Sequence, residues 1–221
     1  MFNNIKAAIF DLDGTLIDSM SLWDQIDIDY LGSKNIAVPS NLNDEISHLS
    51  FNQVALYFKE TFNLEDSLDE IKDTWNSMAH THYSSNIGLK KGVLQFLQFL
   101  KESNIKIGLA TSNSTELLEA SLKFNNIYDY FDEITITDEV GIGKHEPDVY
   151  LLAAKKLKVK PENCIVFEDI LPAVKGAKKA GMKVIAVEDE RSILDQAEII
   201  KNADNYINDF TTLITTNDVA I

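Results

Sequence analysis

The chain has 221 residues, of which 45% are hydrophobic and 25% charged, so it can form one large globular domain or a core domain with a smaller insert. Thirty-five acidic against twenty basic residues give a net charge of −15, which argues against nucleic acid as a partner because polyanions are repelled. No stretch approaches the roughly eighteen apolar residues of a membrane helix, which argues against a membrane protein. A phosphorylated ligand is compatible with this charge only where a metal ion and a few donors overcome the repulsion locally.

Short apolar runs with the length of buried strands recur along the chain. The first, Ile5 to Phe10, leads directly into Asp11 and is too short for the hydrophobic part of a secretion signal, so we expect a cytoplasmic protein. Four similar runs follow, at residues 105–110, 134–137, 164–167 and 184–187. Helix-like segments separate most of them, which predicts a parallel sheet. Cys164 lies in one of these runs, so we expect it to be a packing residue.

Apolar residues spaced by three and four predict helices that cover this sheet. The predicted buried faces are Val93, Phe96, Leu97 and Leu100, then Leu117, Leu118, Ser121 and Leu122, and finally Ala173, Val174, Ala177 and Ala180. Gly181 is placed to end the last of these helices, and Pro161 opens a further segment.

Strand patterns are missing between about residues 18 and 85, where an all-helical insert is the simplest interpretation. Two helical stripes lie there: Met20, Trp23, Ile26 and Tyr30, with Gly32 as the stop, and Leu68, Ile71, Trp75, Met78 and His82. The predicted fold is a three-layer Rossmann-like α/β core of residues 1–16 and 86–221, with a helical cap domain of residues 17–85 inserted into it. Residues 211–221 are weakly patterned, and we expect them to fray.

Two acidic pairs follow predicted buried strands. Asp11 and Asp13 come directly after the first strand, and Glu168 and Asp169 follow a later one. The carboxyl ends of parallel strands form a ligand crevice, so these acids could converge on one side of the sheet. Such a cluster of oxygen ligands suits magnesium. Each pair alone could equally consist of helix N-caps or loop acids.

Two further segments offer what a phosphoryl group requires. Thr111, Ser112 and Asn113 supply hydroxyl and amide donors, and Lys144 supplies a fixed positive charge. Taken alone, the first segment could simply cap the following helix, and the lysine could be a solvated side chain.

The order of these segments is specific. Asp11-Leu12-Asp13-Gly14-Thr15, then Thr111, then Lys144, then Glu168-Asp169 resembles the four-part signature of the haloacid dehalogenase superfamily. The resemblance covers nearly the whole chain, because the helical insert is similar to the cap of the branch that contains phosphatases and beta-phosphoglucomutase-like proteins.

The resemblance implies a role for each matching residue. Asp11 would be the nucleophile that forms an aspartyl-phosphate, with Mg²⁺ bound between it and the phosphate and with Asp169 completing the protein ligands. Glu168 would assist directly or through water. Asp13 would offer its backbone carbonyl to the metal, while its side chain protonates the leaving oxygen and later takes a proton from water.

The remaining motif residues would bind the phosphoryl group. Thr111 and Lys144 would hold its oxygens, and Lys144 would also keep Asp11 ionised. Gly14 would let the backbone turn close to the phosphate, and Ser112 and Asn113 would add donors.

Asp13 separates the phosphate-transferring members from other branches of the superfamily. Dehalogenases lack this second acid, and phosphonate-cleaving relatives typically have a small residue there and a cap lysine for a Schiff base. Lys34, Lys59 and Lys72 lie in the insert, but none stands out from an ordinary solvated face.

A beta-phosphoglucomutase-type phosphotransferase is the nearer alternative. The mutases place a histidine and an arginine at cap positions that match Trp23 and Phe51 here, and losing donors to a second phosphate disfavours a bisphosphate intermediate. We therefore expect a phosphatase acting on a sugar phosphate or similar small phosphomonoester. Trp23 and Phe51 could form an apolar lid over its organic part, although packing alone also explains them.

The lysine motif departs from the family pattern, which commonly has proline directly after the lysine. This chain has Lys144-His145-Glu146-Pro147, so the loop could sit differently, and we expect His145 to be solvent-exposed.

Two other classes of protein remain open. A phosphorylation-switch module also gathers acids, a hydroxyl and a lysine around an aspartyl-phosphate, but the helical insert would be foreign to it. A binding protein that has lost catalysis is disfavoured because every catalytic position is filled. A monomer is compatible with the sequence, which leaves the oligomeric state open.

Overall fold

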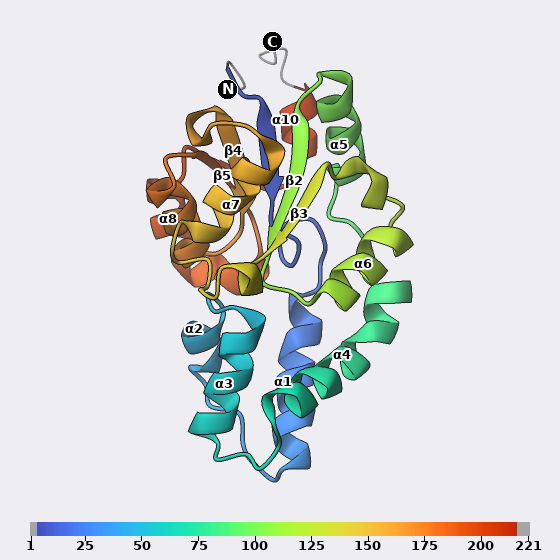
Figure 1. Ribbon diagram of the computed structural model, residues 1–221, viewed down its shortest axis with the longest axis vertical. Coiled ribbons are helices and arrows are strands. Elements are labelled where there is room, and N and C mark those ends of the chain that lie inside the picture. The colour runs from blue at the N-terminus through green and yellow to red at the C-terminus, as the bar shows by residue number, and fades with distance from the viewer. Residues whose placement is uncertain (1–3, 216–221) are drawn as a thin grey trace.

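The computed structural model describes residues 4–215 and contains a six-stranded, fully parallel sheet (Figure 1). Its strands are β1 (Ala7–Phe10), β2 (Lys106–Thr111), β3 (Glu133–Ile136), β4 (Cys164–Glu168), β5 (Lys183–Val187) and β6 (Asn205–Ile207), in the order β3-β2-β1-β4-β5-β6. All five predicted strands are present. The third begins one residue early and ends before Thr137, which starts a short 3₁₀ helix, η2 (Thr137–Glu139). The sequence analysis did not predict β6, a three-residue edge strand in which only Ile207 is buried.

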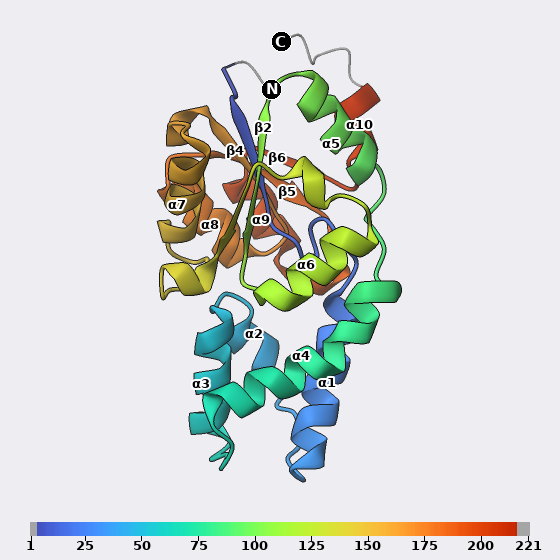
Figure 2. The ribbon, with the colours of Figure 1, turned by 45° about the vertical axis from the view of Figure 1, so that its right-hand side comes forward.

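Helices cover both faces of the sheet, as Figure 2 shows. Alternate residues of β1 point to opposite faces: Ala8 and Phe10 pack with α5 (Val93–Glu102), α6 (Thr115–Phe124) and α10 (Thr211–Thr215). Ala7 and Ile9 pack with α7 (Asp148–Leu157), α8 (Leu171–Lys179) and α9 (Gln196–Asn202). The predicted three-layer α/β core is confirmed.

The predicted helix faces of α5, α6 and α8 are buried. Ala180 caps α8, and the following Gly181 has a φ of +77°, the left-handed conformation that commonly ends a helix. Pro161 opens only η3 (Pro161–Asn163), a single 3₁₀ turn before β4. Cys164 is buried, and burial raises the pKa of its thiol to about 11, which agrees with a packing role.

The helical segment consists of α1 (Met20–Ser33), α2 (Leu42–Ile46), α3 (Phe51–Thr61) and α4 (Leu68–Ser85), and we call these four helices the cap. Ser50 and Ser67 start α3 and α4 with capping boxes. Trp75 is the centre of the cap core, with its ring 4.9 Å from that of Phe58 and 5.7 Å from that of Tyr30. The predicted helical insert is confirmed.

Two details of the cap prediction are wrong. Helix α1 runs through Gly32 to Ser33. In α4 the buried face continues from Trp75 through Ala79 and Tyr83, whereas His82 is exposed, because the face drifts by one residue over the length of the helix.

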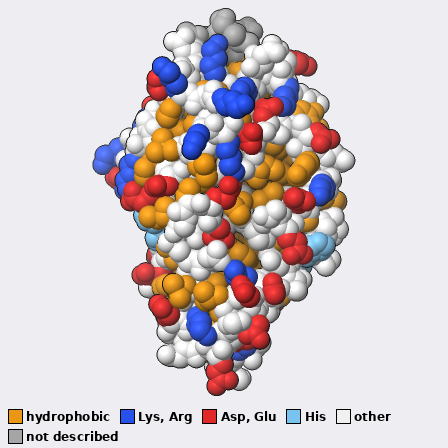
Figure 3. Space-filling view, in the orientation of Figure 1, with side chains coloured by type: hydrophobic (Ala, Val, Ile, Leu, Met, Phe, Trp, Pro, Cys, Tyr) orange, Lys and Arg blue, Asp and Glu red, His pale blue; other side chains and the backbone are white. Residues whose placement is uncertain are grey.

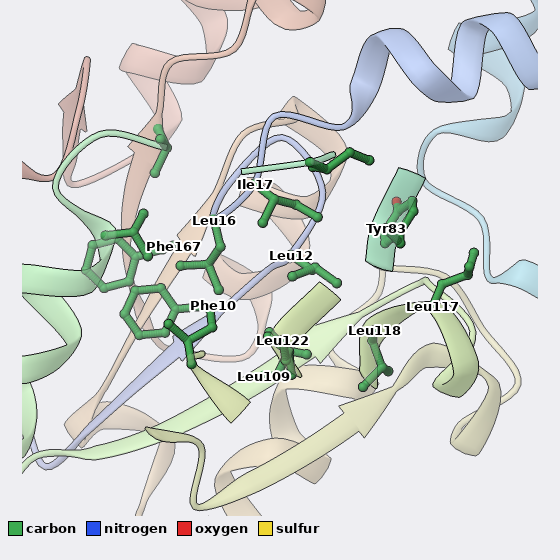
Figure 4. Packing of buried hydrophobic residues seen from close by; sticks show 14 of the residues in the cluster. Phe10, Leu12, Leu16, Ile17, Tyr83, Leu109, Leu117, Leu118, Leu122 and Phe167 are labelled. Atoms are coloured by element: carbon green, nitrogen blue, oxygen red, sulfur yellow. The ribbon is translucent and has the colours of Figure 1, made fainter. Parts of the chain in front are cut away.

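The cap and the sheet share apolar packing. Cap residues belong to the same buried cluster as the α5 and α6 face of the sheet, and Figure 4 shows Tyr83 of α4 with Leu12, Leu16 and Leu117 in this cluster. The packing is therefore continuous, and the division at residues 16/17 and 85/86 stays a prediction.

Charged side chains are spread over the molecule. In Figure 3 acidic groups lie on both the upper and lower parts of the visible face, interspersed with basic groups. Among residues 4–215, no helix is both long enough and apolar enough to cross a membrane.

The C-terminal part of the described chain is anchored by Phe210. Its ring lies 5.5 Å from that of Phe96 and 5.6 Å from that of Phe167, and its side chain is fully buried. The weak patterning of residues 211–215 therefore does not prevent a short helix, α10, from docking on α5.

Phe210→Ala should lower the free energy of unfolding by about 3–5 kcal/mol, because a fully buried aromatic ring is replaced by a cavity. Urea denaturation measures this loss. Phe124→Ala, at a ring that is 40% exposed, is the matched control and should cost less than about 1 kcal/mol. Equal losses in the two variants would contradict the docked position of Phe210.

Candidate active site

The site lies at the carboxyl ends of the central strands. Phe10 of β1 is in register with Leu109 of β2 and with Phe167 of β4, so the residues that follow these positions reach the same edge of the sheet. Asp11, Thr111 and Glu168 are thereby brought together, and the Asp11 backbone N–H donates to the Phe167 carbonyl over 3.0 Å.

Lys144 is the positive centre of this edge. It is only 4% exposed, and its ammonium donates to Asp11 Oδ1 and, over 2.8 Å, to Glu168 Oε1. Burial alone would lower the pKa of Lys144, but the carboxylates of Asp11 and Glu168 raise it above its ordinary value. The lysine is therefore a permanent cation, as phosphoryl binding requires.

Two close backbone approaches fix the Lys144 loop. A Cβ at Gly143 would lie 2.0 Å from the His48 carbonyl oxygen of the cap, and a Cβ at Gly176 of α8 would lie 2.0 Å from the Lys144 carbonyl oxygen. The Lys144 backbone N–H donates to the same His48 carbonyl over 2.9 Å. Only glycine fits at either position, so the loop is held between cap and core.

Asp11, Glu168 and Asp169 form a buried carboxylate cluster whose ligand atoms lie within 4.8 Å of one another. Burial raises the pKa of all three carboxyls, that of Glu168 to about 8. The charge of Asp13 adds to the effect on Asp11, and the charge of Asp11 adds to it on Glu168 and Asp169. Lys144 acts in the opposite direction on Asp11, because its charge and its hydrogen bond lower the pKa of that carboxyl.

The cluster fits a divalent cation. One lysine balances only part of the charge of three carboxylates, and Glu168 Oε2 has no hydrogen-bond partner among the described residues. Gly14, with a φ of +81°, leaves the space next to Asp169 open, because a Cβ there would lie 2.3 Å from Asp169 Oδ2. Oxygen ligands of this kind suit Mg²⁺.

Asp13 accepts hydrogen bonds on both of its carboxylate oxygens. Oδ1 accepts from Ser19 Oγ over 2.6 Å and from the Tyr83 hydroxyl, and Oδ2 accepts from Asn113 Nδ2 over 2.8 Å. The three donors come from different segments: Ser19 directly precedes α1, Tyr83 lies on α4 of the cap, and Asn113 follows β2.

The segment after β2 lies as predicted beside the acids. Thr111 Oγ1 accepts from the Asn113 backbone N–H over 3.1 Å, and Ser112 Oγ is buried without a hydrogen-bond partner among the described residues. Both hydroxyls and Asn113 line the same cavity as the acids. Gly14 does not line it and instead makes room for Asp169.

A cavity of about 160 Å³ lies between this edge of the sheet and the cap. Its floor includes Asp11, Asp13, Lys144, Glu168 and Asp169. Its cap side is mainly apolar, with Met20, Trp23, Ile46, Leu49, Phe51, Val54 and Trp75, and with Asp27, Asn43 and Ser47 as polar groups. Trp23 and Phe51 thus lie where a lid over a substrate's organic part would lie.

His145 is not solvent-exposed, which corrects the prediction. It is half-buried, its ring stands edge-on to His48 of the cap at 4.8 Å, and its Nδ1 is buried. The insertion before Pro147 thus gives the lysine loop a contact with the cap.

The sequence analysis missed two tyrosines of the site. Tyr83 donates to Asp13, and Tyr150 of α7 donates to Glu168 Oε1 over 2.9 Å. Both are fully buried, and burial raises the pKa of each phenol well above its ordinary value. Tyr83 lies one position beyond the predicted stripe of its helix, and no helix was predicted around Tyr150. Their partners lie 70 and 18 residues away, which helical spacing does not reveal.

Comparison with known proteins agrees with this geometry. A family model described as "Haloacid dehalogenase-like hydrolase" matches residues 8–187. The chain belongs to the haloacid dehalogenase-like hydrolases. The resemblance deduced from the four motifs is confirmed.

Named relatives of this hydrolase include phosphatases. It is 28% identical over 200 residues to a phosphorylated carbohydrates phosphatase of Thermotoga maritima, covering 88% of this chain and 93% of that protein. It is 31% identical over 187 residues to hexitol phosphatase B of Escherichia coli, covering 83% of both chains. The crystal structure of a beta-phosphoglucomutase from Clostridium difficile matches with a TM-score of 0.80 and 25% identity, over 95% of this chain and 93% of that one.

Asp27 of α1 is a half-buried acid of the cavity wall that no motif predicted. Burial raises its pKa to about 7, although Arg191 lowers it. Arg191 is itself paired with Asp24 of the cap. Since the folded pKa lies above the value of 3.8 for an unperturbed aspartate, Asp27 costs folding free energy progressively as the pH rises from 3.8 to about 7, and the full cost is present above that range.

Asp27→Asn should therefore stabilise the hydrolase at pH 8.5, by on the order of 1 kcal/mol, and much less at pH 5, where the native carboxyl is already protonated. Thermal unfolding at both pH values measures the difference. Asp29→Asn, at an exposed position of the same helix, should change stability by less than about 0.5 kcal/mol at either pH. A gain from Asp27→Asn that does not depend on pH would contradict the raised pKa.

Proposed function

We propose that this hydrolase is a Mg²⁺-dependent phosphatase that cleaves a small phosphomonoester, such as a sugar phosphate, through an aspartyl-phosphate at Asp11. The main support for this proposal is that one end of a cavity with a mainly apolar cap wall is lined by Asp11, Asp13, Lys144 and Asp169. The names of the Thermotoga and Escherichia coli relatives support a phosphorylated carbohydrate as substrate.

In the first step an Asp11 carboxylate oxygen attacks phosphorus, and the bond from phosphorus to the ester oxygen breaks. Asp13 gives its proton to the leaving oxygen, so the alcohol departs neutral. In the second step water attacks phosphorus, Asp13 takes the water's proton, and the bond from Asp11 to phosphorus breaks to release inorganic phosphate.

Other residues hold the charge that these steps require. Lys144 and the hydroxyl of Thr111 would bind the phosphoryl oxygens. Asp11, Asp169 and the Asp13 carbonyl would hold Mg²⁺, with Glu168 assisting. When bound, Mg²⁺ supplies positive charge that lets a carboxylate approach a phosphate dianion.

The cap side of the cavity favours a monophosphate over a bisphosphate. Trp23 and Phe51 offer no positive charge, and Arg191, the only cation besides Lys144 among the described residues that line the cavity, is paired with Asp24. A second phosphate would be desolvated without a free cationic partner. None of the three cap lysines lines the cavity, so a Schiff-base mechanism has no lysine there.

A beta-phosphoglucomutase activity is the second candidate, because the Clostridium difficile mutase shares the fold over nearly the whole chain. Interconversion of glucose phosphates that is faster than release of inorganic phosphate would favour the mutase.

Action on a small metabolite, rather than on nucleic acid, fits the net charge of −15. Cytoplasmic localisation, a lack of membrane association and a monomeric state stay predictions.

Asp11→Asn should reduce Mg²⁺-dependent phosphate release from 4-nitrophenyl phosphate by at least about a thousandfold, because the nucleophile is lost. Asp18→Asn, at an exposed position of the same segment, is the matched control and should leave the rate unchanged. Phosphate release by Asp11→Asn at the wild-type rate in a clean preparation would rule out Asp11 as the nucleophile.

A further inference from the structure

The hydroxyl of Tyr83 has only one direction in which it can donate. It accepts from Trp23 Nε1 over 2.8 Å and from Asn113 Nδ2 over 3.0 Å. An indole N–H is only ever a donor, and so is an amide NH₂. The Asn113 amide is oriented by its own oxygen, which accepts from the Ser114 backbone N–H over 2.7 Å. Both lone pairs of the phenol oxygen are thus filled, and its hydrogen is left for Asp13.

The two oxygens of Asp13 are consequently unequal. Oδ1 accepts from Tyr83 and from Ser19, which fills both of its lone pairs. Oδ2 accepts only from Asn113 among the described residues, so one lone pair remains open. A proton on Oδ1 would face the Tyr83 hydrogen and leave a buried donor without an acceptor, which costs about 1–3 kcal/mol.

We propose that Tyr83 is a positioning residue that reserves Asp13 Oδ2 as the oxygen that carries the transferred proton. This inference rests on the proposed function, in which Asp13 is the acid and base. The proton moves from Oδ2 to the leaving ester oxygen as the bond from phosphorus to that oxygen breaks, and it returns to Oδ2 from the attacking water. Tyr83 keeps its own proton throughout.

The surroundings of Tyr83 suit this task. Its ring is fully buried in the apolar cluster that contains Leu12 and Ile17, as Figure 4 shows, so the ring cannot turn the hydroxyl away from Asp13. Burial and the Asp13 carboxylate raise the pKa of the phenol well above its ordinary value.

The donors also connect the acid to the cap. Trp23 lies on α1 and lines the cavity, and Tyr83 lies in the last turns of α4. The contribution of Tyr83 to orienting the acid therefore requires both cap helices to be in place, which links this contribution to the wall that faces the substrate.

Leaving-group dependence tests the proposal. Tyr83→Phe is compared with the wild type on phenyl phosphate, whose leaving phenolate needs a proton, and on 4-nitrophenyl phosphate, whose leaving group needs it much less. Rapid-quench measurement of aspartyl-phosphate formation isolates the first step. We expect the rate with phenyl phosphate to fall at least about tenfold more than the rate with 4-nitrophenyl phosphate, with little change in KM.

Tyr30→Phe is the matched control. Tyr30 is also a buried cap tyrosine, but its hydroxyl has no hydrogen-bond partner among the described residues. It should leave both rates unchanged. Equal losses on both substrates in Tyr83→Phe, or no loss, would show that the hydroxyl is only structural and would overturn the proposal.

Two further outcomes are distinguishable. A wild type that releases no phosphate from either substrate would contradict the proposed function itself. If Tyr83→Phe does not fold, Trp23→Phe replaces it: removing the indole donor frees one lone pair of the phenol oxygen and should give the same selective loss to a smaller degree. An unchanged ratio of the two rates in that variant would overturn the proposal.

Discussion

The buried ammonium of Lys144 between Asp11 and Glu168 is the interaction on which the site depends. Burying three carboxylates at one edge of a sheet is unfavourable unless positive charge accompanies them. Lys144 supplies one such charge and gains its high pKa from the same neighbours. Burial, together with the negative charge that one lysine leaves uncompensated, raises the pKa of Asp169, and the same uncompensated charge explains why the cluster fits a divalent cation.

The sheet order makes this arrangement possible. β1 lies between β2 and β4, so the loops that carry Asp11, Thr111 and Glu168 are neighbours although more than fifty residues separate them along the chain. Lys144 reaches them from a loop that is pinned between the cap and α8 by the close approaches at Gly143 and Gly176. The lysine loop thereby joins the cap to the catalytic edge.

Much of the core and of the site could be predicted from the sequence, because buried parallel strands are continuous apolar runs and the acids follow them directly. β6 escaped prediction because an edge strand with a single buried residue has no such run. Tyr83, Tyr150 and the half-buried His145 escaped because their partners come from other elements, and only the packing of α4, α7 and the lysine loop against the sheet brings them together.

The central claim is that Asp11 becomes phosphorylated, and trapping the adduct tests it most directly. Acid quench during turnover of 4-nitrophenyl phosphate, followed by borohydride reduction, converts an aspartyl-phosphate into homoserine, which peptide mass spectrometry can place. The account predicts homoserine at position 11 in the wild type. Homoserine at position 13 or 169 instead, or steady release of phosphate with no reduced residue at position 11, would contradict it.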